Sequence, residues 1–393
     1  MTRVDTVLCG YVCCAPMKVL RVTDVRGRMQ AFGISASALA DQLGVSRQTV
    51  SNWLNGRDLP RPAKLLRLSL ALNLPFDQLV GTEKVPGTPV VAYRMSTNRK
   101  ARDEHYEQAI AKGEALEALV PHLPFDIFVQ PEQIKNPKAD YAYVQSVARS
   151  LREGLGLKDA DPVWFNHLIG RFKDLQSVIV PVLWGKQESH ANALHIYLPQ
   201  HSSTWVYLNL DSSALDFMFW MAHELAHAYT SALCGTDEGE DFADMLASAL
   251  LFPEPCAKVA YEALSATANQ QALVDAIVSE ALERHINVYT VFKQVNAYAA
   301  HHGLPAVEVD PRGLHGTRHR IAAATQTVRE IIFGDEKPSP REYIAKCEEA
   351  FDTSLFKAMS AHIRATGAPA SFVQHILDIP FADAQALHAE LRV

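Results

Sequence analysis

The feature that most restricts the fold is the string His-Glu-Leu-Ala-His at 223–227, which lies inside a largely apolar stretch. Two histidines four positions apart share one face of a helix, so both ring nitrogens can converge on a single ion. A glutamate between them can hold and deprotonate a metal-bound water. We therefore predict a helix over about 213–233 with His223 and His227 as Zn²⁺ ligands and Glu224 as the catalytic base.

A catalytic zinc takes three protein ligands and keeps one position open, so a third ligand is needed. A second helix is predicted from about Glu240 to Leu251, ending at Phe252 because proline follows it. Glu240 shares a face with small alanines that permit close approach to the first helix. We predict Glu240 as the third ligand and Asp244, one turn further on, as a group that orients a ligating histidine. The reverse assignment of these two carboxylates stays open.

A second motif spans 35–56 and has the pattern of a helix, a tight turn at Gly44 and another helix. Ser46 offers its side-chain oxygen to the free N–H groups at the start of the second helix. Apolar residues at helical spacing bury one side of that helix, and polar residues near its start face outward, as in a recognition helix that reads base edges. The predicted DNA-contacting residues are Ser46, Arg47, Gln48, Ser51 and Asn52. The alternative is a helical hairpin used only for protein contacts.

Charge and composition favour one nucleic-acid-binding module on an ordinary globular body. Residues 1–80 carry ten Lys and Arg against five Asp and Glu, a net charge of +5. Since the whole chain has a net charge of −7, the remaining residues carry −12. A basic module on an acidic body is typical of a chain in which only that module meets a polyanion. The sequence has no long apolar run or leader pattern, and its six cysteines lack a paired spacing. We expect a cytoplasmic protein with free thiols and no membrane contact.

Residues 20–80 resemble the phage-repressor-like, or XRE, helix-turn-helix family. The likeness rests on the pattern LA..LGVS...VS.WL.G and on the DLPRP turn that follows it. It implies a five-helix domain that binds operator DNA as a dimer across two half-sites.

Residues 90–255 resemble the ImmA/IrrE metallopeptidase family, through NLDSS and MAHELAHAY followed by E..AD..A..LLFP. The resemblance implies a zincin-like fold and a peptidase that cleaves helix-turn-helix repressors, releasing stress-response or mobile-element genes. Members of that family commonly have Asn where Asp244 stands and Phe where Leu246 stands. The first difference is one reason why the roles of Glu240 and Asp244 stay open.

A chain of 393 residues is too long to fold around one ordinary hydrophobic core, so we expect two or three domains. Three short β-rich runs, 177–184, 193–198 and 204–210, lie among helical patterns, so we predict a mainly α fold with a small β-sheet, of the α+β class. The predicted order is an N-terminal extension (1–19), a five-helix helix-turn-helix domain (20–80), a linker and connecting helix (81–120), a zincin-like metallopeptidase domain (121–256) and a helical C-terminal sensory or dimerisation region (257–393).

Polar residues around the predicted strands are secondary candidates. One of His190, His195 and His201 could polarise a substrate carbonyl or stabilise an oxyanion, and Tyr229 could do the same. For each of them a structural role is the simpler interpretation. The strand 204–210 could align an extended substrate by backbone pairing.

Two functions compete at this point. In the first, the chain is a homodimeric DNA-binding transcriptional regulator with a zinc-dependent peptidase domain that cleaves a helix-turn-helix repressor, or itself, in response to a signal. In the second, it is an autorepressor or antitoxin-like transcription factor whose metal domain is a non-proteolytic sensor platform. A third hypothesis is that the chain is a peptidase whose N-terminal domain binds another protein rather than DNA.

Overall fold

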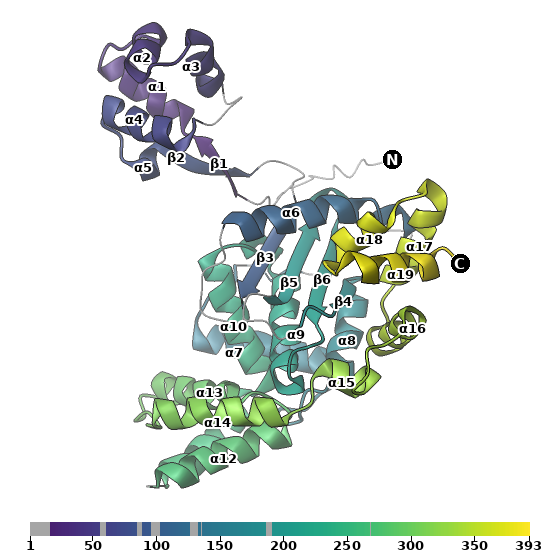
Figure 1. Cartoon of the computed structure of the whole chain (residues 1–393). Helices are drawn as coiled ribbons and strands as arrows, with labels where there is room; N and C mark the ends of the chain where they lie inside the picture. The colour runs from purple at the N-terminus through teal and green to yellow at the C-terminus, as the bar shows by residue number, and fades with distance from the viewer. Residues whose placement is uncertain are drawn as a thin grey trace, which may run out of the picture. The chain divides into compact units, whose positions relative to one another are not determined.

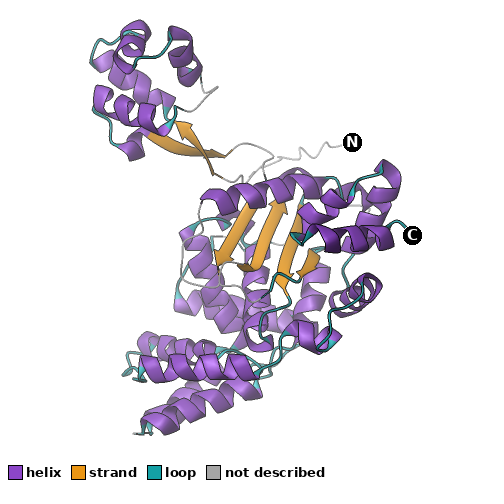
Figure 2. Cartoon of the chain, in the orientation of Figure 1, coloured by secondary structure: helices purple, strands orange, loops and turns teal. Residues whose placement is uncertain are grey.

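The computed structural model describes residues 16–55, 60–84, 89–95, 103–125, 133–134, 136–185, 191–267 and 269–393. The chain divides into two compact units, Met1–Thr88 and Pro89–Val393. Helices dominate the described residues and strands form only small sheets, which confirms the predicted α+β class (Figures 1 and 2). None of the described helices is long and apolar enough to cross a membrane.

Unit 1 is a cluster of short helices built around a small apolar core. Leu39, Leu43, Val50, Trp53 and Leu68 are buried there, at the helical spacing that the sequence showed. The described helices of this unit are α1 (Val22–Ala31), α2 (Ala36–Leu43), α3 (Arg47–Leu54), α4 (Pro62–Leu72) and α5 (Phe76–Leu79).

A two-stranded antiparallel ribbon joins the two ends of unit 1. Its strands are β1 (Pro16–Leu20) and β2 (Val80–Lys84), with Leu20 opposite Val80. Most of β1 lies in the predicted N-terminal extension, and most of β2 lies in the predicted linker. Neither segment has a local periodicity that predicts a strand, because their pairing joins residues about sixty positions apart. Residues 1–15 of the predicted extension, and 85–88 and 96–102 of the predicted linker and connecting helix, lie outside the described residues.

Unit 2 contains a four-stranded mixed sheet in the order β3-β5-β6-β4. The pairs β3–β5 and β5–β6 are antiparallel, whereas β4 runs parallel to β6. The three β-rich runs of the sequence are β4, β5 and β6, whereas β3 lies in the segment predicted to be linker and was missed. The strands are β3 (Val90–Met95), β4 (Val178–Val182), β5 (Ala191–Leu198) and β6 (Ser203–Asn209).

Helices cover both faces of this sheet (Figure 1). On one face lies α6 (Asp103–Glu117), which was predicted as a connecting helix and instead packs on β3 and β5. On the other lies α9 (Ala214–Tyr229), followed by the short 3-10 helix η3 (Ser231–Leu233). Packed beside α9 is α10 (Asp237–Leu251), which ends before Phe252-Pro253 as predicted. Further elements on this part of the chain are η1 (Val120–His122), α7 (Tyr141–Gly154), α8 (Phe165–Asp174) and η2 (Pro199–His201).

The helices after Pro253 share the hydrophobic core of the sheet rather than building one of their own. The Tyr207 hydroxyl of β6 donates to the Ile376 carbonyl at 3.0 Å, and Phe351 and Leu377 are buried in the same cluster as the strands. The helical character predicted for 257–393 is observed. These helices are α11 (Glu254–Ser265), α12 (Gln270–Glu283), α13 (Val288–His301), α14 (Pro311–Ala324), α15 (Val328–Phe333), α16 (Pro340–Phe351), α17 (Leu355–Thr366), α18 (Ala370–Leu377) and α19 (Phe381–Leu391).

Candidate metal centre and helix-turn-helix surface

Helix α9 carries His223, Glu224 and His227 into the interior of unit 2, where all three side chains are buried. Ser213 caps the start of this helix, accepting a hydrogen bond from the Asp216 N–H at 3.3 Å. The four-residue spacing places both histidines on one face. Their Nε2 atoms lie 3.0 Å apart and point at a common position.

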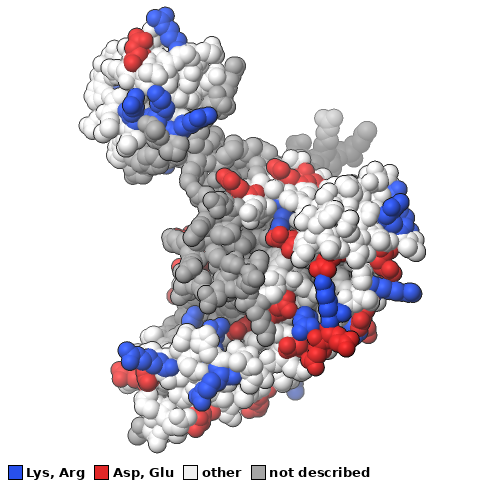
Figure 3. All heavy atoms as spheres, in the orientation of Figure 1, with Lys and Arg blue, Asp and Glu red and all other residues white. Residues whose placement is uncertain are grey.

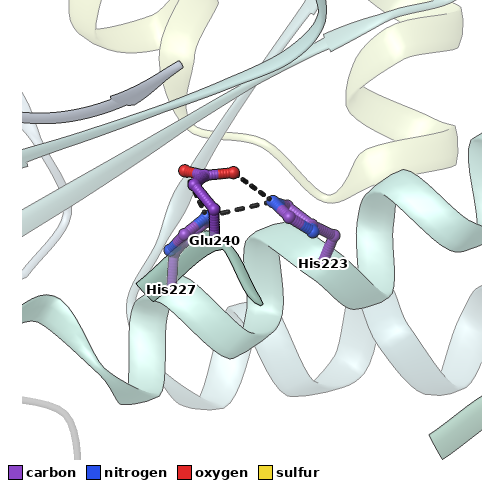
Figure 4. Close-up of side chains that lie close together, drawn as sticks. All are labelled: His223, His227 and Glu240. Carbon is purple, nitrogen blue, oxygen red and sulfur yellow. Dashed lines mark hydrogen bonds and ion pairs between the residues drawn. The ribbon is translucent and has the colours of Figure 1, made fainter. Parts of the chain in front are cut away.

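Glu240 of α10 completes a group of three donor atoms (Figure 4). Its Oε2 lies 3.3 Å from His223 Nε2, and its Oε1 lies 3.3 Å from His227 Nε2. Tetrahedral zinc with bonds of about 2.0–2.1 Å requires ligand atoms roughly 3.3 Å apart, and the Glu240 carboxylate approaches each histidine at that distance, through a different oxygen for each. Among the described residues this is the only group of three His, Cys, Asp or Glu side chains whose ligand atoms lie within 4.8 Å of one another.

Asp244 lies on the other side of the His223 ring. Its Oδ1 is 3.1 Å from His223 Nδ1, whereas Glu240 faces the Nε2 atoms of both histidines. A carboxylate behind a histidine fixes the ring's tautomer and makes its opposite nitrogen a better ligand. The geometry thus favours Glu240 as the ligand and Asp244 as the orienting group.

The electrostatics of the group suit a cation. Burial lowers the pKa of His223, but the Asp244 and Glu240 carboxylates outweigh it and raise that pKa to about 9. Burial raises the pKa of Glu240, but its two histidine partners outweigh burial and hold that pKa well below its usual range. The carboxylates of Glu240, Asp244 and Glu224 therefore gather around two buried imidazoles, and a divalent cation would balance this charge.

Of the three histidines predicted near the strands, His195 is the one that the structure places beside this group. It lies on β5, is fully buried, and its Nδ1 is 3.8 Å from Glu224 Oε2. His201 lies on η2 and is half-buried, and His190 lies outside the described residues. The signal in the sequence was a histidine within the apolar strand ALHIYL, which alone could not indicate its neighbours.

Two subsidiary expectations are resolved by the fold. Tyr229 is buried, and its hydroxyl accepts a hydrogen bond from Arg171 Nε, so it is a packed core residue. The proposal that strand 204–210 pairs with substrate is wrong. That segment is β6, which is flanked by β5 and β4, so its backbone is already paired on both sides.

The outward face of α3 holds the predicted DNA-contacting residues. Ser46 caps this helix, its Oγ accepting from the Thr49 N–H at 3.0 Å, as predicted. Arg47 and Gln48 are exposed, and Ser51 and Asn52 are half-buried. Gln48 Nε2 donates to Asn52 Oδ1 at 2.9 Å, which orients the Gln48 amide at the surface.

Two cationic side chains outside the predicted motif residues hold the helices of the motif together. Lys64 Nζ donates to the carbonyls of Leu43 at 2.6 Å and Gly44 at 3.2 Å, at the end of α2. Arg26 Nη2 donates to the Leu54 carbonyl at 2.8 Å, at the end of α3. Both satisfy carbonyls that helix ends leave without helical partners. On the face of unit 1 in view, Lys and Arg predominate over Asp and Glu (Figure 3).

Comparison with known proteins bears on unit 1. A protein-family model described as helix-turn-helix matches residues 25–79. The search of curated proteins and the search of solved structures each found no match. Residues 25–79, which include most of α1 and all of α2 to α5, are therefore a helix-turn-helix domain, the fold with which transcription regulators bind DNA.

Proposed function

We propose that this DNA-binding regulator carries a zinc-dependent peptidase in unit 2, and that its substrate is a helix-turn-helix repressor or the chain itself. The observation that carries the proposal is the convergence of His223 Nε2, His227 Nε2 and the Glu240 carboxylate, since one ligand atom from each residue lies within 4.8 Å of the other two. Glu224, on the same helix, is positioned one residue from a ligand. The resemblance of residues 90–255 to the ImmA/IrrE family supports a repressor as the substrate.

Each residue of the centre has a distinct task in this mechanism. His223, His227 and Glu240 would hold zinc, and Asp244 would keep the His223 ring in the tautomer that presents Nε2. Zinc, when bound, would supply Lewis acidity toward the scissile carbonyl and toward water. Glu224 would take a proton from the attacking water and deliver it to the departing amine.

An extended substrate would pair with an edge strand of the sheet, since β6 is not open to it. Within the described strands the edges are β3 and β4. Of these, β3 lies next to β5, with Ala92 in register with His195. We therefore assign substrate alignment to β3 rather than β6.

The test measures zinc content and proteolysis on the full chain. The wild type should hold one zinc and fragment unfolded β-casein or itself. Glu224→Gln should keep the zinc and cleave about a hundredfold to ten-thousandfold more slowly, because it lacks the base. A double variant, His223→Ala with His227→Ala, should hold no zinc.

Zinc retained by the double variant would rule out the metal centre. A wild type that holds zinc but leaves all substrates intact, and that regulates transcription just as Glu224→Gln does, would rule out the peptidase. The non-proteolytic sensor would then be the better account of unit 2. Operator binding by each variant serves as the control for folding of unit 1.

A further inference from the structure

The His195 side chain is buried without the hydrogen bonds that an imidazole normally makes. It is fully buried, and neither ring nitrogen has a partner at hydrogen-bond geometry among the described residues. The Glu224 backbone also lies beside the ring, without that geometry. Buried polar groups in folded proteins are nearly always paired, so a ring in this state calls for an explanation, and the Glu224 carboxylate lies 3.8 Å from its Nδ1.

The sheet directs this ring at the metal centre. Successive residues of a strand face opposite sides. Ile196 faces α6, since a Cβ added at Gly113 of that helix would lie 3.2 Å from Ile196 Cγ2. His195 therefore faces α9, and its ring centroid lies 5.8 Å from that of His227. It is nevertheless outside the group of His223, His227 and Glu240 that could hold the ion.

We propose that His195 is a positioning residue, whose Nδ1–H donates to the Glu224 carboxylate and holds it in the orientation that serves the metal centre. The inference rests on the proposed function and deepens it. His195 would touch neither metal nor substrate, and would act through Glu224 alone.

The chemistry of the contact is consistent with this role. Burial, reinforced by His227 and His223, holds the pKa of His195 well below its usual range, so the ring is neutral and carries a single N–H. The separation of 3.8 Å between Nδ1 and Glu224 Oε2 exceeds an ordinary N–H···O bond by about 0.8 Å. Catalytic hydrogen bonds are often this long before a site is loaded, and they tighten in the working complex.

Three variants on the zinc-loaded full chain test the role by activity. His195→Leu keeps the volume and removes the donor, whereas His195→Asn places an amide N–H near the position of Nδ1. We expect His195→Leu to lower kcat for β-casein at least tenfold with KM and zinc content unchanged, and His195→Asn to restore most of it. Combined with Glu224→Gln, His195→Leu should add no further loss, because both act through one carboxylate. Equal losses in the Leu and Asn variants, or losses that add to that of Glu224→Gln, would show a packing role and overturn the proposal.

A second measurement needs no substrate. In nitrogen NMR of the zinc-loaded chain labelled at histidine, His195 should be the Nδ1–H tautomer, its signal identified by its loss in His195→Asn. Glu224→Gln should shift that signal. A proton on Nε2, or a signal that Glu224→Gln leaves unmoved, would place the hydrogen bond elsewhere, for example on the Glu224 backbone, and would overturn the proposal. If the wild type cleaves nothing, the peptidase fails while this measurement still decides the contact.

Discussion

The two carboxylates of α10 should differ sharply in their effect on zinc affinity. Glu240 places Oε2 3.3 Å from His223 Nε2 and Oε1 3.3 Å from His227 Nε2, so Glu240→Ala removes one of the three proposed ligands. The Asp244 carboxylate lies 3.1 Å from His223 Nδ1, on the side of the ring away from the proposed ion, so Asp244→Ala leaves all three proposed ligands in place and removes the group that orients one. Asp241 is exposed on the same helix and provides a control with the same loss of charge.

The magnitudes follow from these positions. Loss of a group that orients a ligand typically lowers metal affinity about 10–100-fold, or roughly 1.4–2.8 kcal/mol. Asp244→Ala should fall in that range, Glu240→Ala should lose more, and Asp241→Ala should stay within about twofold of the wild type, because an exposed charge is screened.

Competition of the full chain with a chromophoric zinc chelator at fixed pH and salt measures all four affinities. Thermal unfolding of the zinc-free proteins checks that the substitutions leave the fold intact. If Asp244→Ala loses more affinity than Glu240→Ala, the two carboxylates have exchanged roles. If neither differs from Asp241→Ala, the geometric argument for the centre is refuted.

Two further predictions concern the other features of the chain. Arg47→Ala and Gln48→Ala should weaken binding to a DNA site selected from a random pool, by about 1–3 kcal/mol each where the side chain reads a base. Arg21→Ala, at the start of α1, is the control and should weaken binding less. If the binding curves of all three variants coincide at matched salt, α3 is not the recognition helix. Gly235→Ala should destabilise unit 2 by more than Gly303→Ala. Both glycines have positive φ, at a strain of about 1–2 kcal/mol for alanine, but only at Gly235 would the new Cβ meet a backbone atom, 2.9 Å away. Equal midpoints in thermal unfolding would contradict the close approach at Gly235.

Much of the site was predictable because its main elements are local. His223, Glu224 and His227 form one face of one helix, and a spacing of four residues determines that face wherever the helix packs. The Ser46 cap and the turn at Gly44 depend on hydrogen bonds and φ angles within a few residues. For the same reason three strands could be recognised from their own β-rich runs.

The sequence by itself determined which side chains could bind a metal or read DNA, and that they lie on helices. Only the tertiary structure decided that Glu240 faces both Nε2 atoms while Asp244 lies behind His223, that 90–95 joins the sheet, and that His195 meets Glu224. The physical reason is that these contacts join segments far apart along the chain. Their geometry depends on strand order and helix packing, which the periodicity of a single segment does not record.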